Sequence, residues 1–185
     1  MTENNATQQP TITTGSGRVL PTYPAAVLAY VIDEQERILM LSSPNSNNGW
    51  EPPNGAMDAD ETPLQAAIRE LAEEAGPDVR ARPLGVCHAV GFAYDQGAPN
   101  MISLSFVFAY AGGAVEPGDD MRGSKVKWAT VDEIESHTMR IIAPRDTPWV
   151  FRRAVECYRL WKDAPAVELQ PPIDAKNARP KYSDE

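Results

Sequence analysis

The stretch that decides the fold spans residues 55–77 and reads GAMDADETPLQAAIRELAEEAGP. Thr62 and Gln65 have the spacing of a capping box, in which each side chain binds the other residue's backbone N–H. Apolar residues then recur at intervals of three and four positions, until Gly76 and the proline after it end the pattern. This combination predicts an amphipathic helix over Pro63–Ala75.

Three carboxylates share one face of this predicted helix. Glu70, Glu73 and Glu74 stand at positions i, i+3 and i+4, which are neighbours on a helix surface. They lie near the C-terminal end, where the helix dipole disfavours each negative charge by about 0.3–1 kcal/mol, and Arg69 offsets only part of the repulsion. A hard divalent cation such as Mg²⁺ would relieve it. For the bare spacing, a solvated acidic face on a surface helix is the commoner explanation.

The charge of the chain is concentrated in the same stretch. The 185 residues carry a formal net charge of −9, and residues 55–78 hold seven acidic side chains and only one basic one. Residues 79–162 are slightly basic, with eleven basic and nine acidic side chains. This distribution argues against a broad basic surface for nucleic acid, which is the usual electrostatic footprint of such proteins.

Strands and further helices are predicted around the acidic helix. Apolar runs of strand length occur on both sides of it, with hairpin-type turns between them. The predicted strands are 25–32, 37–41, 85–94, 102–110 and 126–129, and the further helices are 130–136 and 147–161.

The composition divides the chain into one domain and two polar ends. Residues 1–22 have little to bury, and we interpret them as a flexible N-terminal arm. Residues 23–163 contain the predicted elements and form the expected domain, whereas residues 164–185 form a Pro-rich tail.

The acidic helix and its flanks resemble the Nudix box. That signature has the form G-x5-E-x7-R-E-U-x-E-E-x-G-U, where U is aliphatic, and here it is matched from Gly55 through Glu61 to Gly76. The departure is Pro77 at the last aliphatic position, where we expect altered packing beneath the loop. The preceding Trp50-Glu51-Pro52-Pro53-Asn54-Gly55 resembles the family's W-x-x-P-G-G, with Asn54 in place of a glycine.

The resemblance implies an α/β fold, a Nudix-type α/β/α sandwich with a mixed sheet. It also implies a pyrophosphohydrolase that cleaves a nucleoside diphosphate linked to another moiety, with Mg²⁺ as cofactor and Mn²⁺ as a substitute. By the same resemblance, the metal ligands are Glu70, Glu73 and Glu74, and Glu70 or a loop acid is the general base. Glu61 supports the metal site or pairs with Arg69.

Three further roles follow from the resemblance. Arg69 holds the acidic cluster in shape, Gly55 permits the tight loop, and Asn54 offers a backbone carbonyl to the metal. Many members place another Glu shortly before the late strand. Residues 121–125 contain no acid here, so we favour Asp120 as the replacement, with two other loop acids, Glu116 and Asp119, as alternatives.

Candidate substrate contacts lie outside the box. Tyr94 is 17 residues beyond position 77, near the place where members acting on diadenosine polyphosphates often have a Tyr, and it could stack on a base. Trp50 is either a stacking residue or an anchor for its loop. Lys125 and Lys127 could contact phosphate, or belong to an ordinary solvated surface.

The substrate remains open at this level. A dinucleoside polyphosphate or a nucleoside triphosphate fits the motif, whereas the proline typical of members acting on ADP-ribose is missing near Tyr94. The alternative is a catalytically silent module of the same fold that senses a nucleotide, but such modules usually lose the acids of the box. Removal of pyrophosphate from RNA ends is disfavoured by the net charge of −9.

The cellular setting is expected to be cytoplasmic. The N-terminal residues lack the pattern of a secretory signal, and no apolar run reaches the ~18 residues of a membrane span. Two cysteines, Cys87 and Cys157, are too few for a disulfide framework. These features predict no membrane partner. The resemblance implies a small-molecule nucleotide-derived substrate, and we expect a monomer or a homodimer.

Overall fold

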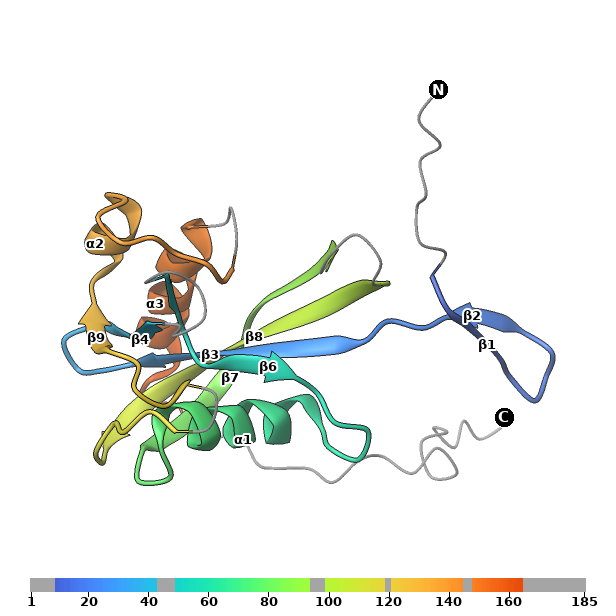
Figure 1. Cartoon of the computed structure of the whole chain (residues 1–185), viewed down its shortest axis with the longest axis horizontal. Coiled ribbons are helices and arrows are strands. Elements are labelled where there is room, and N and C mark those ends of the chain that lie inside the picture. Colours follow the sequence, from blue (N-terminus) through green and yellow to red (C-terminus); the bar gives the residue numbers. More distant parts are fainter. Residues whose placement is uncertain (1–8, 43–48, 94–98, 119–120, 145–147, 165–185) are drawn as a thin grey trace, which may run out of the picture.

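The computed structural model describes residues 9–42, 49–93, 99–118, 121–144 and 148–164. Six strands precede the first helix, three more strands follow it, two helices end the described chain, and most of the strands join one sheet (Figure 1). In chain order the elements are β1 (Thr11–Thr13), β2 (Val19–Pro21), β3 (Ala25–Ile32), β4 (Ile38–Ser42), β5 (Trp50–Glu51), β6 (Asn54–Ala56), α1 (Pro63–Ala75), β7 (Arg80–Ala93), β8 (Asn100–Gly112), β9 (Val126–Ala129), α2 (Val131–Glu135) and α3 (Trp149–Trp161).

The main sheet is mixed, as expected. In the described part of the chain it has seven strands, with the order β5-β4-β3-β8-β7, while β6 pairs with β3 and β9 pairs with β4. The central strands β3 and β8 run parallel, from the pair Ala25 and Ile102 to the pair Ile32 and Ala109. The other strand pairs of this sheet are antiparallel. The sheet therefore combines local hairpins with one long-range parallel pairing.

Strand β3 is apolar throughout because both faces of the sheet are covered. Val27, Ala29 and Val31 pack in the hydrophobic cluster on the α1 side. The alternate residues Leu28, Tyr30 and Ile32 pack in the cluster on the α3 side. Figure 1 shows α1 and α3 on opposite sides of the sheet, so the predicted α/β/α sandwich is confirmed.

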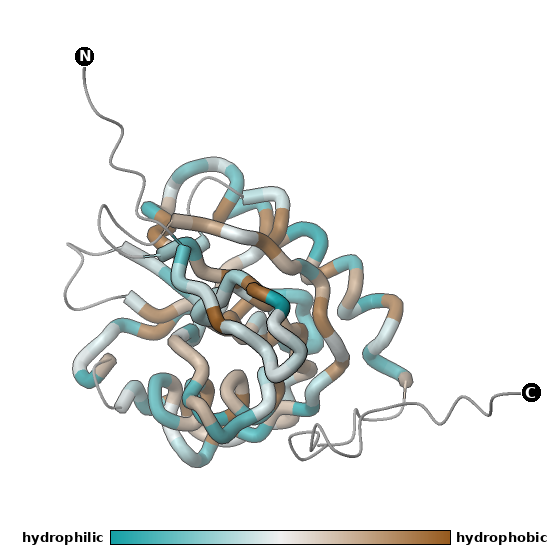
Figure 2. The backbone as a smooth tube through the Cα atoms, turned by 90° about the vertical axis from the view of Figure 1, so that its right-hand side faces the viewer, coloured by the Kyte–Doolittle hydropathy of each residue, from teal (hydrophilic) through white to brown (hydrophobic). Residues whose placement is uncertain are grey.

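The two long helices are amphipathic, and each presents an apolar side to the sheet. Figure 2 shows hydrophilic and hydrophobic residues interspersed along the backbone. Buried residues of α1 include Ala67 and Leu71, and those of α3 include Phe151 and Ala154. The ring of Phe151 meets Tyr30 of β3 edge-on, with ring centroids 5.3 Å apart. Helix α3 is therefore part of the folded body.

The hairpin β3–β4 has a structured turn. The carboxylate of Asp33 accepts hydrogen bonds from the backbone N–H groups of Gln35 and Arg37, at 3.0 and 2.9 Å. Its other oxygen accepts from Nε of Arg37 at 2.8 Å. The side chain of Asp33 thus stabilises the turn that was predicted between these two strands.

The N-terminal arm contains a short hairpin that the sequence did not predict. Strands β1 and β2 pair antiparallel and project from the body in Figure 1. The side chain of Gln9 connects the arm to β8, because the backbone N–H of Asn100 donates to Gln9 Oε1 at 2.9 Å. The flexibility of the arm stays a prediction, and the expected Pro-rich tail lies outside the described residues apart from Ala164.

The boundaries of two strands also differ from expectation. Strand β7 begins at Arg80 rather than at residue 85, and it tolerates Pro83 because the pairing with β8 has irregularities there. Strand β8 runs two residues at each end beyond the predicted 102–110. No helix in the described ranges is long and apolar enough to cross a membrane.

Candidate active site

Helix α1 begins and ends where the sequence pattern predicts. Thr62 Oγ1 accepts from the N–H of Gln65 at 3.3 Å, and Gln65 Oε1 accepts from the N–H of Thr62 at 2.8 Å. This capping box fixes the first turn, while the buried apolar face fixes the rotation of the helix about its axis. The three predicted carboxylates are therefore displayed beside strand β6 and the loop that follows it.

Arg69 is the centre of the acidic cluster. Its guanidinium donates to both oxygens of Glu61, at 3.1 and 2.7 Å, and to Glu70 Oε1 and Glu73 Oε2 at 2.8 and 2.9 Å. A further hydrogen bond goes to the backbone oxygen of Ala56 at 2.9 Å. The hydrogen bond with Glu61 is the main cause that raises the pKa of Arg69, and the same bond lowers the pKa of Glu61. Arg69 thus joins the helix to the segment that carries Ala56 and Glu61.

Gly55 leaves room for the carboxylate of Glu70. A Cβ atom added at Gly55 would lie 2.1 Å from Glu70 Oε1, a distance that forces one of them to move. Gly55 pairs with Val27 in the ladder between β6 and β3, so it cannot shift away easily. The side chain of Glu70 is only 12% exposed. The glycine is therefore required by this close approach.

Glu74 is buried at the same end of the site. Glu74 is only 6% exposed, and its Oε2 accepts a hydrogen bond from the backbone N–H of Asn54 at 2.8 Å. The carboxamide of Asn54 in turn donates to Glu51 Oε2 at 3.1 Å and to the backbone oxygen of Pro52 at 2.9 Å. Glu51 was not singled out from the sequence, because its distance in the chain from the helix hid the contact.

The C-terminal end of α1 is closed by a distant segment. The backbone N–H groups of Glu116 and Gly118 donate to the carbonyl oxygens of Ala75 and Glu74, at 2.9 and 3.2 Å. Gly76 has φ +106°, and a Cβ there would lie 2.7 Å from the oxygen of Glu116. These amides satisfy terminal carbonyls of the helix and lower the electrostatic cost of acids in its last turn.

Pro77 does not fill the place beneath the loop where the aliphatic residue of the motif is expected to pack. Its side chain is exposed, and the apolar cluster on the α1 side is joined instead by Val79. The packing at this position is therefore altered, as expected, because Val79 and not Pro77 contributes to that cluster.

The remaining candidates are not all brought to the acidic cluster. Trp50 packs against the cluster beneath α3, which supports its role as a loop anchor. Lys127 forms an ion pair with Glu133 of α2 at 2.9 Å. Lys125 is exposed, and its backbone N–H donates to Ser42 Oγ at 2.8 Å. Two further candidates, Tyr94 and Asp120, lie outside the described residues.

The carboxylates offer oxygen ligands of the kind that Mg²⁺ prefers. Glu70 lies against Gly55, where the absence of a Cβ leaves room for it, and Glu74 accepts the backbone N–H of Asn54. Across the described ranges, however, no three acidic, His or Cys side chains converge in a geometry that could hold a metal ion. Glu73 is directed to Arg69 and its side chain is 41% exposed, so it would have to turn to become a third ligand.

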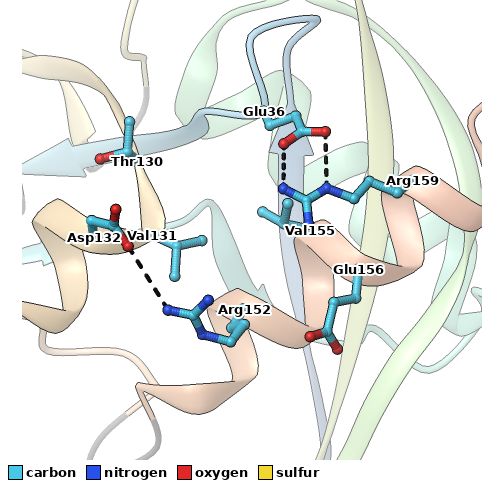
Figure 3. Close-up of a pocket in the computed structure, with 8 residues that line it drawn as sticks. All are labelled: Glu36, Thr130, Val131, Asp132, Arg152, Val155, Glu156 and Arg159. Atoms are coloured by element: carbon cyan, nitrogen blue, oxygen red, sulfur yellow. Dashed lines mark hydrogen bonds and ion pairs between the residues drawn. The ribbon is translucent and has the colours of Figure 1, made fainter.

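A separate hollow of about 330 Å³ lies between α2, α3 and the turn after β3 (Figure 3). Its two arginines are both engaged with carboxylates. Arg159 Nε donates to Glu36 at 2.9 Å, and Arg152 Nε donates to Glu135 at 3.0 Å. This hollow lies on the α3 side of the sheet, whereas α1 lies on the other, so we do not assign it to the acidic site.

Comparison with known proteins agrees with the resemblance to the Nudix family. The family model of the NUDIX domain matches residues 22–150. A MutT-like protein of Streptomyces ambofaciens is 29% identical over 126 residues, which cover 68% of this chain and 75% of that protein. The CMP-5'-(N-acetyl-N-hydroxy-3-aminopropyl)phosphonate hydrolase of Streptomyces rubellomurinus is 32% identical over 116 residues, which cover 60% of this chain and about half (53%) of that enzyme.

A solved structure supports the fold independently. The MutT protein of Methanosarcina mazei superimposes with a TM-score of 0.58 at 22% identity, covering 72% of this chain and 94% of the other. At that level of identity the likeness concerns the arrangement of the elements. The arrangement of the sheet and the helices in this chain therefore also occurs in a solved structure.

Proposed function

The chain belongs to the NUDIX domain family, which includes named hydrolases, and on that premise we propose that it cleaves a pyrophosphate bond in a nucleotide-derived substrate with the help of Mg²⁺. The substrate would be a nucleoside diphosphate linked to another moiety. The observation that carries the proposal is the pair of inward-held carboxylates, Glu70 against Gly55 and Glu74 on the N–H of Asn54.

The proposed ligands of the cation are Glu70, Glu73 and Glu74. Arg69 donates to both Glu70 and Glu73, and Glu73 would have to turn away from it to reach the cation. A bound Mg²⁺ would offset the negative charge of the phosphate oxygens and lower the pKa of the attacking water. The chain's own residues hold these groups in place: Glu61 and Arg69 tie the helix to the loop through two hydrogen bonds. Arrangement in advance of binding lowers the reorganisation needed at the moment of reaction.

The hydrolysis itself needs one proton acceptor. Water adds to a phosphorus atom, the bond from that phosphorus to the bridging oxygen breaks, and the water's proton passes to a carboxylate. We propose Glu70 for this role, with the loop that contains Glu116 as the alternative source of the base. The backbone of Glu116 already binds the end of α1, which keeps this loop beside the acidic helix.

The class of substrate follows from the same arrangement. An acidic site binds a phosphate-bearing compound only when a cation offsets the repulsion. A relative's name, CMP-5'-(N-acetyl-N-hydroxy-3-aminopropyl)phosphonate hydrolase, describes action on a compound that contains CMP. This supports a nucleotide as one half of the substrate, and we propose dinucleoside polyphosphates and nucleoside triphosphates as the first compounds to examine.

The test is a substrate panel with the full chain and Mg²⁺ or Mn²⁺. It contains nucleoside triphosphates, dinucleoside polyphosphates, nucleotide sugars and dinucleotide cofactors, and the products are resolved by chromatography. We expect turnover of at least one class, and a loss of about a hundredfold or more in kcat/KM for Glu74→Gln, which keeps an oxygen acceptor for Asn54. Binding without any turnover would instead identify a nucleotide-sensing module.

A further inference from the structure

Asn54 stands where the family motif has a glycine, and its side chain forms hydrogen bonds. Its backbone N–H binds Glu74, while its carboxamide donates to Glu51 Oε2 and to the backbone oxygen of Pro52. Asn54 therefore connects Glu51 of β5 to Glu74 of α1, and Glu74 lies 20 positions after Asn54 in the chain.

The backbone at this position does not require glycine. Among the described residues other than glycine, only Glu36 and His137 have positive φ. Asn54 pairs with Leu28 as the first residue of β6, which is ordinary strand geometry. Its side chain is therefore the feature that distinguishes this chain, because it restricts a loop in which glycine would leave the backbone freer.

Glu51 is well placed to anchor that side chain. It pairs with Leu41 of β4, and Leu41 belongs to the cluster on the α1 side, so Glu51 lies on the same side of the sheet as the acidic helix. The preceding Trp50 packs on the opposite side and exchanges backbone hydrogen bonds with residues 140 and 142, at 2.8 and 3.0 Å. The strand that carries Glu51 is thus fixed from both sides.

We propose that Glu51 is a positioning residue for the cation-binding carboxylates, and that it acts through Asn54 on Glu74. The proposal rests on the proposed function, since it assigns Glu74 to the cation. Glu51 holds the carboxamide of Asn54, the carboxamide fixes the peptide whose N–H binds Glu74, and Glu74 is thereby kept in one orientation. Partners of this kind typically change metal affinity by about 10–100-fold when removed.

The test measures Mn²⁺ binding to the full chain, with free Mn²⁺ followed by electron paramagnetic resonance. For Glu51→Ala we expect a Kd about tenfold weaker than that of the unchanged chain. Asn54→Gly, which restores the family's residue, should weaken binding by a similar factor, and the double variant should be no weaker than either single one. Glu51→Gln, which keeps an acceptor for Asn54, should stay within about twofold of the unchanged chain.

A matched control removes an equal charge elsewhere. Glu156 is exposed on α3, across the sheet from the acidic helix, and Glu156→Ala should leave the Kd unchanged. Circular dichroism and the melting temperature without metal show whether each variant is folded, and the two Glu51 substitutions provide independent routes if one variant is unstable.

Three outcomes overturn the inference. The first is an unchanged Kd for Glu51→Ala. The second is multiplication of the two single effects in the double variant, which would show that Glu51 acts without Asn54. The third is an equal loss in Glu51→Gln and Glu51→Ala, which would show that its charge matters rather than its hydrogen bond. If the unchanged chain binds no Mn²⁺, the proposed function fails and this inference with it. If it binds Mn²⁺ and one of these three outcomes is found, the inference alone fails.

Discussion

Gly55 and Glu70 are in such close contact that a single added carbon would fill the space of the carboxylate: a Cβ at Gly55 would lie 2.1 Å from Glu70 Oε1. The two residues come from strand β6 and helix α1, so their contact sets the distance between the loop and the helix.

Gly55→Ala should therefore displace Glu70 and impair both stability and activity. Overpacking of this kind typically costs about 1–3 kcal/mol of the free energy of unfolding. We expect the melting temperature to fall by several degrees and kcat/KM to fall more steeply, as Glu70 leaves its position. The matched control is Gly15→Ala, since a Cβ at Gly15 meets nothing within 4 Å. Equal melting temperatures for the two variants would contradict this account.

Arg69→Lys should weaken the link between helix and loop. A lysine ammonium cannot reproduce the planar guanidinium that serves Glu61, Glu70 and Glu73 at once. Loss of charge-assisted hydrogen bonds is expected to cost about 2 kcal/mol, or roughly 4–8 °C in melting temperature for a chain of this size.

The control for this substitution is a surface arginine. Arg152 lies in an ion pair on α3, and its side chain is 53% exposed. Arg152→Lys should leave the melting temperature unchanged, because exposed ion pairs contribute little. A drop for Arg152→Lys as large as that for Arg69→Lys would refute the central role of Arg69.

The acid sensitivity of α2 should depend on Glu133. Hydrogen bonds from the backbone N–H of Thr130 and from Lys127 lower the pKa of Glu133 from 4.5 to about 2. A carboxylate with a lowered pKa adds stability above its ordinary pKa, and this contribution disappears as the pH falls from 4.5 toward about 2. Glu133→Gln does not titrate, so its deficit relative to the unchanged chain should shrink across this window.

Thermal unfolding in buffers from about pH 6 to about pH 2.5 measures this difference. Lys127→Gln serves as a second variant, because removal of the ammonium should shift the loss of stability to higher pH. A constant difference between Glu133→Gln and the unchanged chain at every pH would rule out the assigned linkage.

Ser103 offers a gain in stability. It is 5% exposed, and its Oγ has no hydrogen-bond partner in the described part of the chain. A buried hydroxyl without a partner is unfavourable, so Ser103→Ala should leave the melting temperature equal or higher. Ser42→Ala should lower it, because Ser42 Oγ accepts the N–H of Lys125 at 2.8 Å. A clear loss for Ser103→Ala would reveal a partner for this hydroxyl.

Local sequence signals predicted the local structure well. The helix over Pro63–Ala75 is confirmed at both ends, because its cap and its glycine stop act within a few residues. The importance of Gly55 was also accessible, since the motif marks it, but the structure places it in strand β6 against Glu70 rather than in a tight loop. These features depend on neighbours in the chain, which a sequence displays directly.

Long-range contacts were not accessible in the same way. The link from Glu51 through Asn54 to Glu74 depends on the fold bringing β5 and β6 to the helix. Val79, and not Pro77, packs against the apolar cluster on the α1 side, and this depends on the path of the chain after α1. Likewise, the partner of Lys127 lies on a different element. In each case the contact joins elements that are distant in the sequence and come together only in the folded protein. The spacing of apolar residues along the chain does not reveal such contacts.

The closure of α1 by Glu116 and Gly118 also imposes an order on folding. The last carbonyls of the helix find their N–H partners about forty residues later in the chain, after the whole β7–β8 hairpin. Contacts so distant in sequence form late, because a long loop must first be ordered. We therefore expect the acidic end of the helix to become rigid only after β7 and β8 have been made, and a nascent chain that ends before residue 116 to lack these two partners of the last carbonyls.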